Sequence, residues 1–178
     1  MKKNYPQSEG LYNNSFEHDA CGIGAITNIK GVKSHKIIED SLTILANLEH
    51  RGGTGAEENT GDGAGILLQV PYRFFKEEAQ KLGVILPNVS EYAVGMFFLP
   101  QNEDARREGK KIFEEAVQNE GLEFIVWRKV PVNSSGLGKS ALEVMPQIEQ
   151  AFVKRPKNIT TVEEFERRFL KRLYKKKD

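Results

Sequence analysis

Glycine is concentrated at the amino-terminal end of this chain of 178 residues, where ten of its sixteen glycines fall within the first 65 residues. Eight of these ten form three short groups, Cys-Gly-Ile-Gly at 21–24, Arg-Gly-Gly-Thr-Gly at 51–55 and Gly-Asp-Gly-Ala-Gly at 61–65. Glycine tolerates positive φ and lets other atoms approach the backbone closely. The pattern therefore predicts that this part of the chain wraps around a small ligand.

The remainder of the chain alternates between strand-like and helix-like apolar patterns. The predicted strands are 22–29, 66–70, 91–99, 124–130 and 147–153. The predicted helices are 34–49, capped by Ser34, 71–82, begun by Pro71 and ended by Gly83, 103–119, and 162–174. This interleaving does not by itself separate a doubly wound sheet from an α+β sandwich.

The bulk composition excludes several classes of protein. The net charge is only +1, so no nucleic-acid partner is indicated, and the basic run at 167–177 is interpreted as a solvated helix face. The apolar run at 92–99 is far shorter than the roughly 20 residues that a membrane-spanning helix needs. Residues 1–10 contain no apolar stretch of the kind found in secretory signals. We therefore expect a cytoplasmic chain of one domain without a membrane segment.

Cys21 is the only cysteine, so the chain can form neither an internal disulfide nor a thiolate-rich zinc site. The histidines His18, His35 and His50 are scattered without metal-ligand spacing. We expect surface histidines and no metal site. A lone intracellular cysteine is more often buried filler than a nucleophile, so its surroundings must decide between the two.

Three surroundings of Cys21 suit an amino-terminal nucleophile. Gly22 and Gly24 leave the backbone beside the sulfur uncrowded, a polar segment of twenty residues precedes it, and two glycine-rich turns follow. If residues 1–20 are removed, the free α-amine, with a pKa of about 7.7–8.0, can take the proton of a thiol whose pKa is about 8.5. A buried structural cysteine beside glycines would have a similar sequence, so this evidence is suggestive only.

Four blocks of sequence stand out in order along the chain, at 17–24, 48–53, 60–67 and 127–132. Together they resemble the large subunit of the glutamate synthases. Glu-His-Asp-Ala-Cys-Gly-Ile-Gly at 17–24 is similar to that family's propeptide junction and first strand. Leu-Glu-His-Arg-Gly-Gly at 48–53 and Thr-Gly-Asp-Gly-Ala-Gly-Ile-Leu at 60–67 resemble its next two blocks, and Trp-Arg-Lys-Val-Pro-Val at 127–132 resembles a later one. The resemblance extends from Leu11 to about Tyr174.

The resemblance implies a class II glutamine amidotransferase domain of the amino-terminal-nucleophile hydrolase type. Its fold is α+β, a four-layer αββα sandwich, here incomplete at the carboxyl-terminal end. Residues 1–20 would be the propeptide and 21–178 the first part of the amidotransferase domain. In the family, the cysteine attacks the side-chain amide of L-glutamine, a thioester forms, and the released ammonia aminates 2-oxoglutarate to give glutamate. The implied role is therefore in ammonia assimilation.

The site residues carried over by the resemblance are few. Cys21 matches the nucleophile, and Arg51 matches an arginine near it whose cation favours the thiolate. A structural ion pair at a helix end is an equally weighted alternative for Arg51. Gly61, Asp62 and Gly63 are given a role in shaping the site. The family's oxyanion-hole and substrate-binding segments do not occur in this chain, and we expect them beyond Asp178.

No cofactor is expected in this chain, because the resemblance places the FMN and the iron–sulfur cluster in later domains of the family. The expected partners are L-glutamine and the remaining glutamate synthase domains or subunits. We expect the isolated chain to be inactive. The alternative is a non-catalytic interaction module that docks to another subunit. The run Gly-Leu-Gly-Lys-Ser at 136–140 matches only the end of a phosphate-binding loop, because Asn133 stands where that loop needs glycine.

Overall fold

The structure is a computed structural model that describes residues 22–49, 57, 59–61 and 63–174, without the side chains of 171–174. The chain divides into two compact units, which we call the amino-terminal unit, residues 1–67, and the carboxyl-terminal unit, residues 68–178. Within the described residues, no helix has the length and apolar character needed to cross a membrane.

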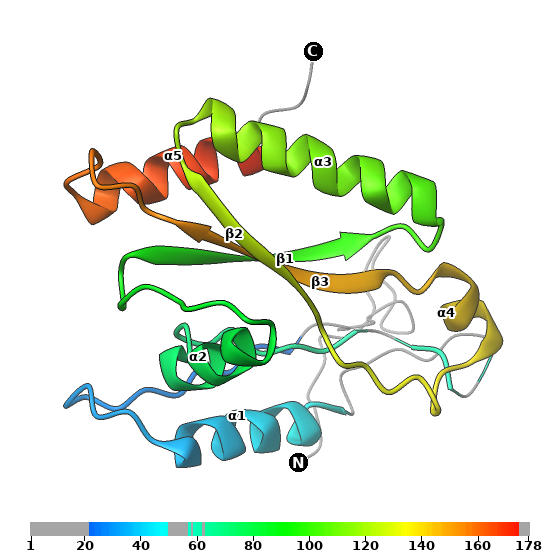
Figure 1. Cartoon of the computed structure of the whole chain (residues 1–178). Helices are drawn as coiled ribbons and strands as arrows, with labels where there is room; N and C mark the ends of the chain where they lie inside the picture. The colour runs from blue at the N-terminus through cyan, green and yellow to red at the C-terminus, as the bar shows by residue number, and fades with distance from the viewer. Residues whose placement is uncertain (1–21, 50–56, 58, 62, 175–178) are drawn as a thin grey trace, which may run out of the picture. The chain divides into compact units, whose positions relative to one another are not determined.

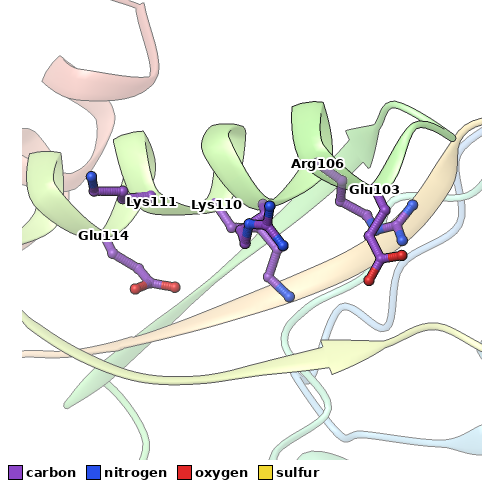
Figure 2. Close-up of a pocket in the computed structure, with 6 residues that line it drawn as sticks. Glu103, Arg106, Lys110, Lys111 and Glu114 are labelled. Carbon is purple, nitrogen blue, oxygen red and sulfur yellow. The ribbon is translucent and has the colours of Figure 1, made fainter.

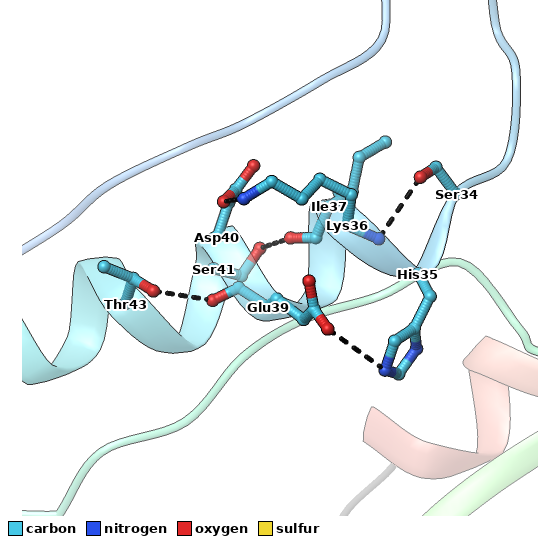
Figure 3. A network of polar contacts seen from close by, with 8 residues as sticks. All are labelled: Ser34, His35, Lys36, Ile37, Glu39, Asp40, Ser41 and Thr43. Carbon is cyan, nitrogen blue, oxygen red and sulfur yellow. Dashed lines mark hydrogen bonds and ion pairs between the residues drawn. The ribbon is translucent and has the colours of Figure 1, made fainter.

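The described part of the amino-terminal unit is built around one helix, α1 (His35–Asn47). The helix begins where the sequence predicts, because the Ser34 side chain accepts a hydrogen bond from the backbone N–H of Lys36. A turn precedes it, in which Gly31 adopts a φ of 67° and the Asn28 side-chain oxygen accepts from the N–H of Lys30 at 2.9 Å. Figure 3 shows the polar side of α1, where hydroxyl groups and ion pairs hold the helix surface.

The predicted strands 22–29 and 66–70 are wrong for this structure, since neither segment is in a strand. Their apolar residues are largely exposed, as Ile23 and Leu67 illustrate at 97% and 100%. A strand requires a neighbour that pairs with its backbone. Local sequence cannot supply that neighbour, and none of the strands in the described ranges takes this role.

The carboxyl-terminal unit contains the remaining elements. They are α2 (Tyr72–Lys81), β1 (Tyr92–Leu99), α3 (Glu103–Asn119), β2 (Glu123–Lys129), α4 (Lys139–Val144), β3 (Gln147–Lys154) and α5 (Val162–Tyr174). The predicted elements of this region are confirmed to within one residue or so at each end. Gly83 and Gly121 end α2 and α3 with φ values of 74° and 69°. Helix α4 was not predicted, because its six residues are too few to show a helical period.

The three strands form one antiparallel sheet in the order β1-β3-β2. Figure 1 shows α3 and α5 on one side of this sheet and α2 on the other. The sheet side that carries α3 and α5 buries Val117, Leu122, Val153, Ile159 and Phe165. The opposite side buries Phe75, Ala79 and Leu86 with Tyr92 and Phe152. The carboxyl-terminal unit is thus a three-layer arrangement with an aromatic-rich core on each face of its sheet.

Successive side chains of a strand point to opposite faces of the sheet, and two adjacent residues of β3 thereby contact a helix on each face. Glu149 accepts from Lys110 of α3 at 2.7 Å. Its neighbour Gln150 accepts from Arg128 of β2 at 2.9 Å, and the same guanidinium bonds Glu78 of α2 at 2.5 Å. Because Arg128 and Gln150 are each only 7% exposed, their polar groups need these partners. The polar contacts therefore fix the positions at which the two helices pack on the sheet.

The predicted mixture of helices and antiparallel strands is confirmed. The described strands belong to a single sheet, so the second sheet of a four-layer sandwich stays a prediction.

Candidate functional site

Of the five predicted site residues, three lie outside the residues that the structure describes and two lie within them. Cys21, Arg51 and Asp62 lie outside the described residues, as do His18 and His50. Gly61 is exposed and makes an isolated bridge, and Gly63 is exposed with no atom close enough to touch an added methyl group. His35 is a surface residue, as predicted, with 78% of its side chain exposed.

The segment that follows Cys21 packs directly against α1 and its end. A methyl group on Gly24 would lie 2.4 Å from Cγ2 of Ile44, closer than carbon atoms can approach. A methyl group on Gly22 would lie 3.0 Å from Cδ2 of Leu48. Glycine is therefore needed at position 24, where the backbone itself makes the contact, whereas a side chain at position 22 would require Leu48 to shift. The sequence predicts an uncrowded backbone at these glycines, whereas in the structure Ile44 and Leu48 already fill the space that a side chain would need.

This contact brings together two stretches that the sequence connects to the candidate chemistry. Gly22 is bonded to Cys21, and Leu48 is followed within three residues by Arg51. The carboxyl-terminal cap of α1 is Leu48, whose N–H bonds the carbonyls of Ile44 and Leu45 at 3.1 and 3.0 Å. The end of α1 is thus ordered at the point where it meets the segment beside Cys21.

A second ordered turn precedes the Gly61–Gly63 loop. The Thr60 hydroxyl donates to the Glu57 carboxylate at 2.9 Å, and the Thr60 N–H donates to the Glu57 carbonyl at 3.1 Å. The sequence analysis did not single out this pair. Its signal is the spacing of three residues between an acidic side chain and a threonine, which is common in local turns.

A surface hollow lies along α3 and carries four basic side chains (Figure 2). Its charges are already engaged by the protein. Arg106 donates to the carbonyl of Gln101 at 2.9 Å, Arg107 pairs with Asp104 at 2.5 Å and Lys111 pairs with Glu115 at 3.8 Å. Glu114 accepts from the indole nitrogen of Trp127 at 2.6 Å. With Lys110 paired to Glu149, each of the four basic side chains of the hollow therefore has a protein partner.

Within the ranges that the structure describes, no group of three or more His, Cys, Asp and Glu side chains has a geometry that could hold a metal ion. The donor set of the whole sequence also fails to fit an iron–sulfur cluster, because such clusters are held by several thiolates and this chain has one cysteine.

Comparison with protein families assigns the chain to a known family. Residues 21–177 match the family described as "Glutamine amidotransferases class-II". The match begins at Cys21 and includes both units.

Comparison with curated proteins agrees. The chain is 40% identical over 163 residues to the "Glutamate synthase [NADPH] large chain" of Bacillus subtilis, a match that covers 92% of this chain and 11% of that protein. It is 40% identical over 149 residues to the "Ferredoxin-dependent glutamate synthase 2, chloroplastic" of Arabidopsis thaliana, covering 84% of this chain and 9% of that protein. It is also 40% identical over 148 residues to the "Glutamate synthase [NADH]" of Schizosaccharomyces pombe, covering 83% of this chain and 7% of that protein. The chain therefore spans about a tenth of the length of these relatives, and it belongs to the class-II glutamine amidotransferases, with a sequence like that of the glutamate synthases.

Proposed function

We propose that this chain forms the nucleophile-bearing part of a glutaminase centre. Removal of residues 1–20 frees the α-amine of Cys21, which takes the thiol proton. The thiolate attacks the side-chain amide carbon of L-glutamine, and ammonia leaves with a proton returned from the amine. Water then hydrolyses the γ-glutamyl thioester to glutamate and restores the thiol.

The observation that carries this proposal is the contact of Gly22 and Gly24 with α1. Consecutive Cα atoms are about 3.8 Å apart, so Cys21 is tethered one residue from an anchored glycine. Arg51 is tethered three residues from Leu48, on the other side of the same contact. We propose that Arg51 lies near the sulfur of Cys21 and lowers the pKa of the thiol. The loop containing Gly61, Asp62 and Gly63 shapes the same site.

Two features of the sequence support maturation at Cys21. The family match starts at this residue, and residues 1–20 are largely polar. A chemistry that uses the α-amine as its base requires this terminus to be free. Residues 1–20 are therefore proposed as a propeptide and 21–178 as the first part of the amidotransferase domain, whose complete form is the four-layer sandwich.

In the whole protein, the ammonia would be used to convert 2-oxoglutarate to glutamate in domains that carry FMN and an iron–sulfur cluster. We propose that the reaction takes place in the cytoplasm. The segments that the resemblance assigns to the oxyanion hole and to substrate binding do not occur in these 178 residues. Loss of one oxyanion donor alone costs about 10²–10³ in turnover. The isolated chain is therefore proposed to be inactive until those segments are supplied.

A domain exchange tests the proposal. Residues 21–178 replace the matched segment of the Bacillus subtilis relative, behind that enzyme's own leader, and glutamate release from L-glutamine is measured. We expect a matured chimera that starts at Cys21, hydrolyses glutamine and is labelled at Cys21 by 6-diazo-5-oxo-L-norleucine. Cys21→Ala in the same chimera removes both signals.

Mass spectrometry of the isolated chain provides the second arm, because any thiol label can only lie on the single cysteine. A folded chimera without glutaminase activity, together with a retained Met1 terminus and an unreactive thiol, would overturn the proposal in favour of a non-catalytic module.

A further inference from the structure

Among the residues that the structure describes, strand β1 lies at one edge of the sheet and has a defined outward side. The N–H of Arg155 donates to the carbonyl of Glu91 at 2.8 Å, which sets the phase of the β1–β3 ladder. Antiparallel strands bond through alternate residues. Ala93, Gly95, Phe97 and Leu99 therefore bond to β3. Tyr92, Val94, Met96 and Phe98 direct their backbone N–H and C=O groups away from β3, toward the free edge.

The two edges of the sheet differ in the features that block further pairing. β2 carries Glu123, Arg128 and Lys129 and contains an irregularity between Phe124 and Val126. Charged side chains and bulges of this kind are the usual protection of an edge strand. β1 has the sequence Tyr-Ala-Val-Gly-Met-Phe-Phe-Leu, with no charge and no proline. Two of its outward-bonding residues are also exposed apolar side chains, Met96 at 51% and Phe98 at 67%. The β1 edge thus lacks the protection against further pairing that the β2 edge has.

The order of the elements indicates where the next strand would lie. The connection from β1 through α3 to the parallel strand β2 crosses one face of the sheet, and α5 leaves β3 over that same face (Figure 1). Such crossovers are right-handed in about 98% of cases. Because β3 runs opposite to β1, a crossover of the same hand over the same face must move across the sheet in the opposite direction. A strand after α5 therefore reaches the outer edge of β1, antiparallel to β1.

We propose that the free edge of β1 is the docking site for a fourth strand, contributed by the polypeptide that follows α5 in the glutamate synthases. The match covers 11% of the Bacillus subtilis relative, so ample chain exists in the whole enzymes to provide it. The addition completes a β-α-β-β-α-β unit in the order β4-β1-β3-β2. The inference rests on topology and family membership and is independent of the proposed glutaminase chemistry.

The geometry also defines the chemistry of the docking strand. About seven residues are needed to pair with the eight of β1, with main-chain bonds to Tyr92, Val94, Met96 and Phe98. Apolar side chains are expected on the face that carries Met96 and Phe98, because they cover surface that is exposed in this chain. On the other face, the rings of Phe97 and Phe169 already fill the space beside Gly95, so the docking strand needs no large side chain there.

Amide hydrogen exchange, read residue by residue, tests the proposal. The 178-residue chain is compared with a fusion in which Asp178 is followed by the next 30 or so residues after the matched region of the Bacillus subtilis relative. We expect the amides of Tyr92, Val94, Met96 and Phe98 to exchange at least about tenfold more slowly in the fusion. The amides of Trp127 and Lys129 face the β2 edge by the same alternation and serve as internal controls that do not change.

Several outcomes would overturn the proposal. Protection that appears at Trp127 and Lys129 places the strand at the wrong edge. Protection of the four β1 amides already present in the 178-residue chain means that another segment or, if it depends on concentration, a second copy covers the edge. If the fusion does not fold, the same segment is added as a synthetic peptide.

A lysine placed on the β1 edge and a lysine placed elsewhere on the surface provide a matched pair of variants. Met96→Lys is expected to abolish the added protection, and Val144→Lys, at a residue of α4 that is 80% exposed, is expected to preserve it. Retained protection in Met96→Lys contradicts the proposal.

Discussion

The two units of this chain differ in what they contain: the carboxyl-terminal unit has the buried core, and the amino-terminal unit has the candidate site residues. The described part of the carboxyl-terminal unit contains both hydrophobic clusters, the sheet, and side chains as completely buried as Phe152 at 1% and Val153 at 0%. In the described part of the amino-terminal unit no residue is buried. Yet the candidate nucleophile, the candidate arginine and the glycine loop all belong to the amino-terminal unit. The unit with the packed core is thus a different one from the unit with the candidate site.

This difference indicates that, among the described residues of the amino-terminal unit, order beside the candidate site depends on local contacts and not on a buried core. Burial of apolar surface is the main favourable term in folding, so the described residues of the amino-terminal unit contribute little stability through burial. Its local order comes from contacts such as that between Gly24 and Ile44 and from the capped helix α1. We therefore expect substitutions in the two units to have different readouts.

The largest expected effect is the loss of a core aromatic ring in the carboxyl-terminal unit. Phe152 contacts Phe75 with ring centroids 5.2 Å apart and lies at the centre of one cluster. Phe152→Ala is expected to lower the free energy of unfolding by about 3–5 kcal/mol. Urea unfolding followed by the fluorescence of Trp127, the only tryptophan, measures it.

Ile85→Ala is the control for the core substitution. Ile85 is 88% exposed, so its removal should change the same free energy by less than about 0.5 kcal/mol. Equal losses in the two variants would mean that the core assignment is wrong.

The next effect tests the amino-terminal unit. In the chimera, Gly24→Ala forces a methyl group against Ile44, at a local cost of about 1–3 kcal/mol. Because the shifted segment is bonded to Cys21, we expect glutamine turnover to fall about tenfold or more. The urea midpoint of the carboxyl-terminal unit should not move.

A rescue separates this steric effect from a general loss of folding. Ile44→Ala removes the atom that clashes, so the double variant should recover most of the turnover. Gly136→Ala, at a glycine with no atom within 4 Å of the added methyl group, is the silent control. Equal turnover in Gly24→Ala and Gly136→Ala would contradict the claim that the contact between Gly24 and Ile44 positions Cys21.

A smaller effect is expected at Arg51. In a chain that begins at Cys21, the cation should lower the pKa of the thiol, and Arg51→Gln should raise it by about one unit or more. The pH dependence of iodoacetamide alkylation measures this, since the label has one thiol to react with. Arg73→Gln, at an exposed arginine in the other unit, is the control. An unchanged thiol pKa favours the structural ion pair that the sequence left open.

The smallest effect concerns the acid stability of the carboxyl-terminal unit. Hydrogen bonds from Lys81 and then Arg128 hold the pKa of Glu78 below its usual value of 4.5. A lowered folded pKa contributes stability above the unfolded pKa, and that stability is lost as the pH falls through the folded pKa. Glu78→Gln should therefore flatten the decline of the urea midpoint below about pH 4.5, and Lys81→Met should flatten it in part. An identical acid decline in all three proteins would contradict this role.

The local signals in the sequence predicted the start of α1 and most of the secondary structure of the carboxyl-terminal unit. Ser34, Pro71, Gly83 and Gly121 mark helix ends because capping, a fixed φ and a positive φ are properties of single residues. The predicted strands 22–29 and 66–70 failed because a strand depends on a partner that local sequence does not contain. Helix α4 was missed because six residues are too short for a periodic signal.

The sequence by itself determined the family, the single thiol at position 21 and the order of helices and strands beyond residue 70, because each is encoded in residue identity and local spacing. Only the tertiary structure decided the strand order β1-β3-β2, the burial of Arg128 between Glu78 and Gln150, and the contact of Gly24 with Ile44. These depend on which distant segments meet. The period of a strand or helix says which face is apolar, but it does not say what that face will cover.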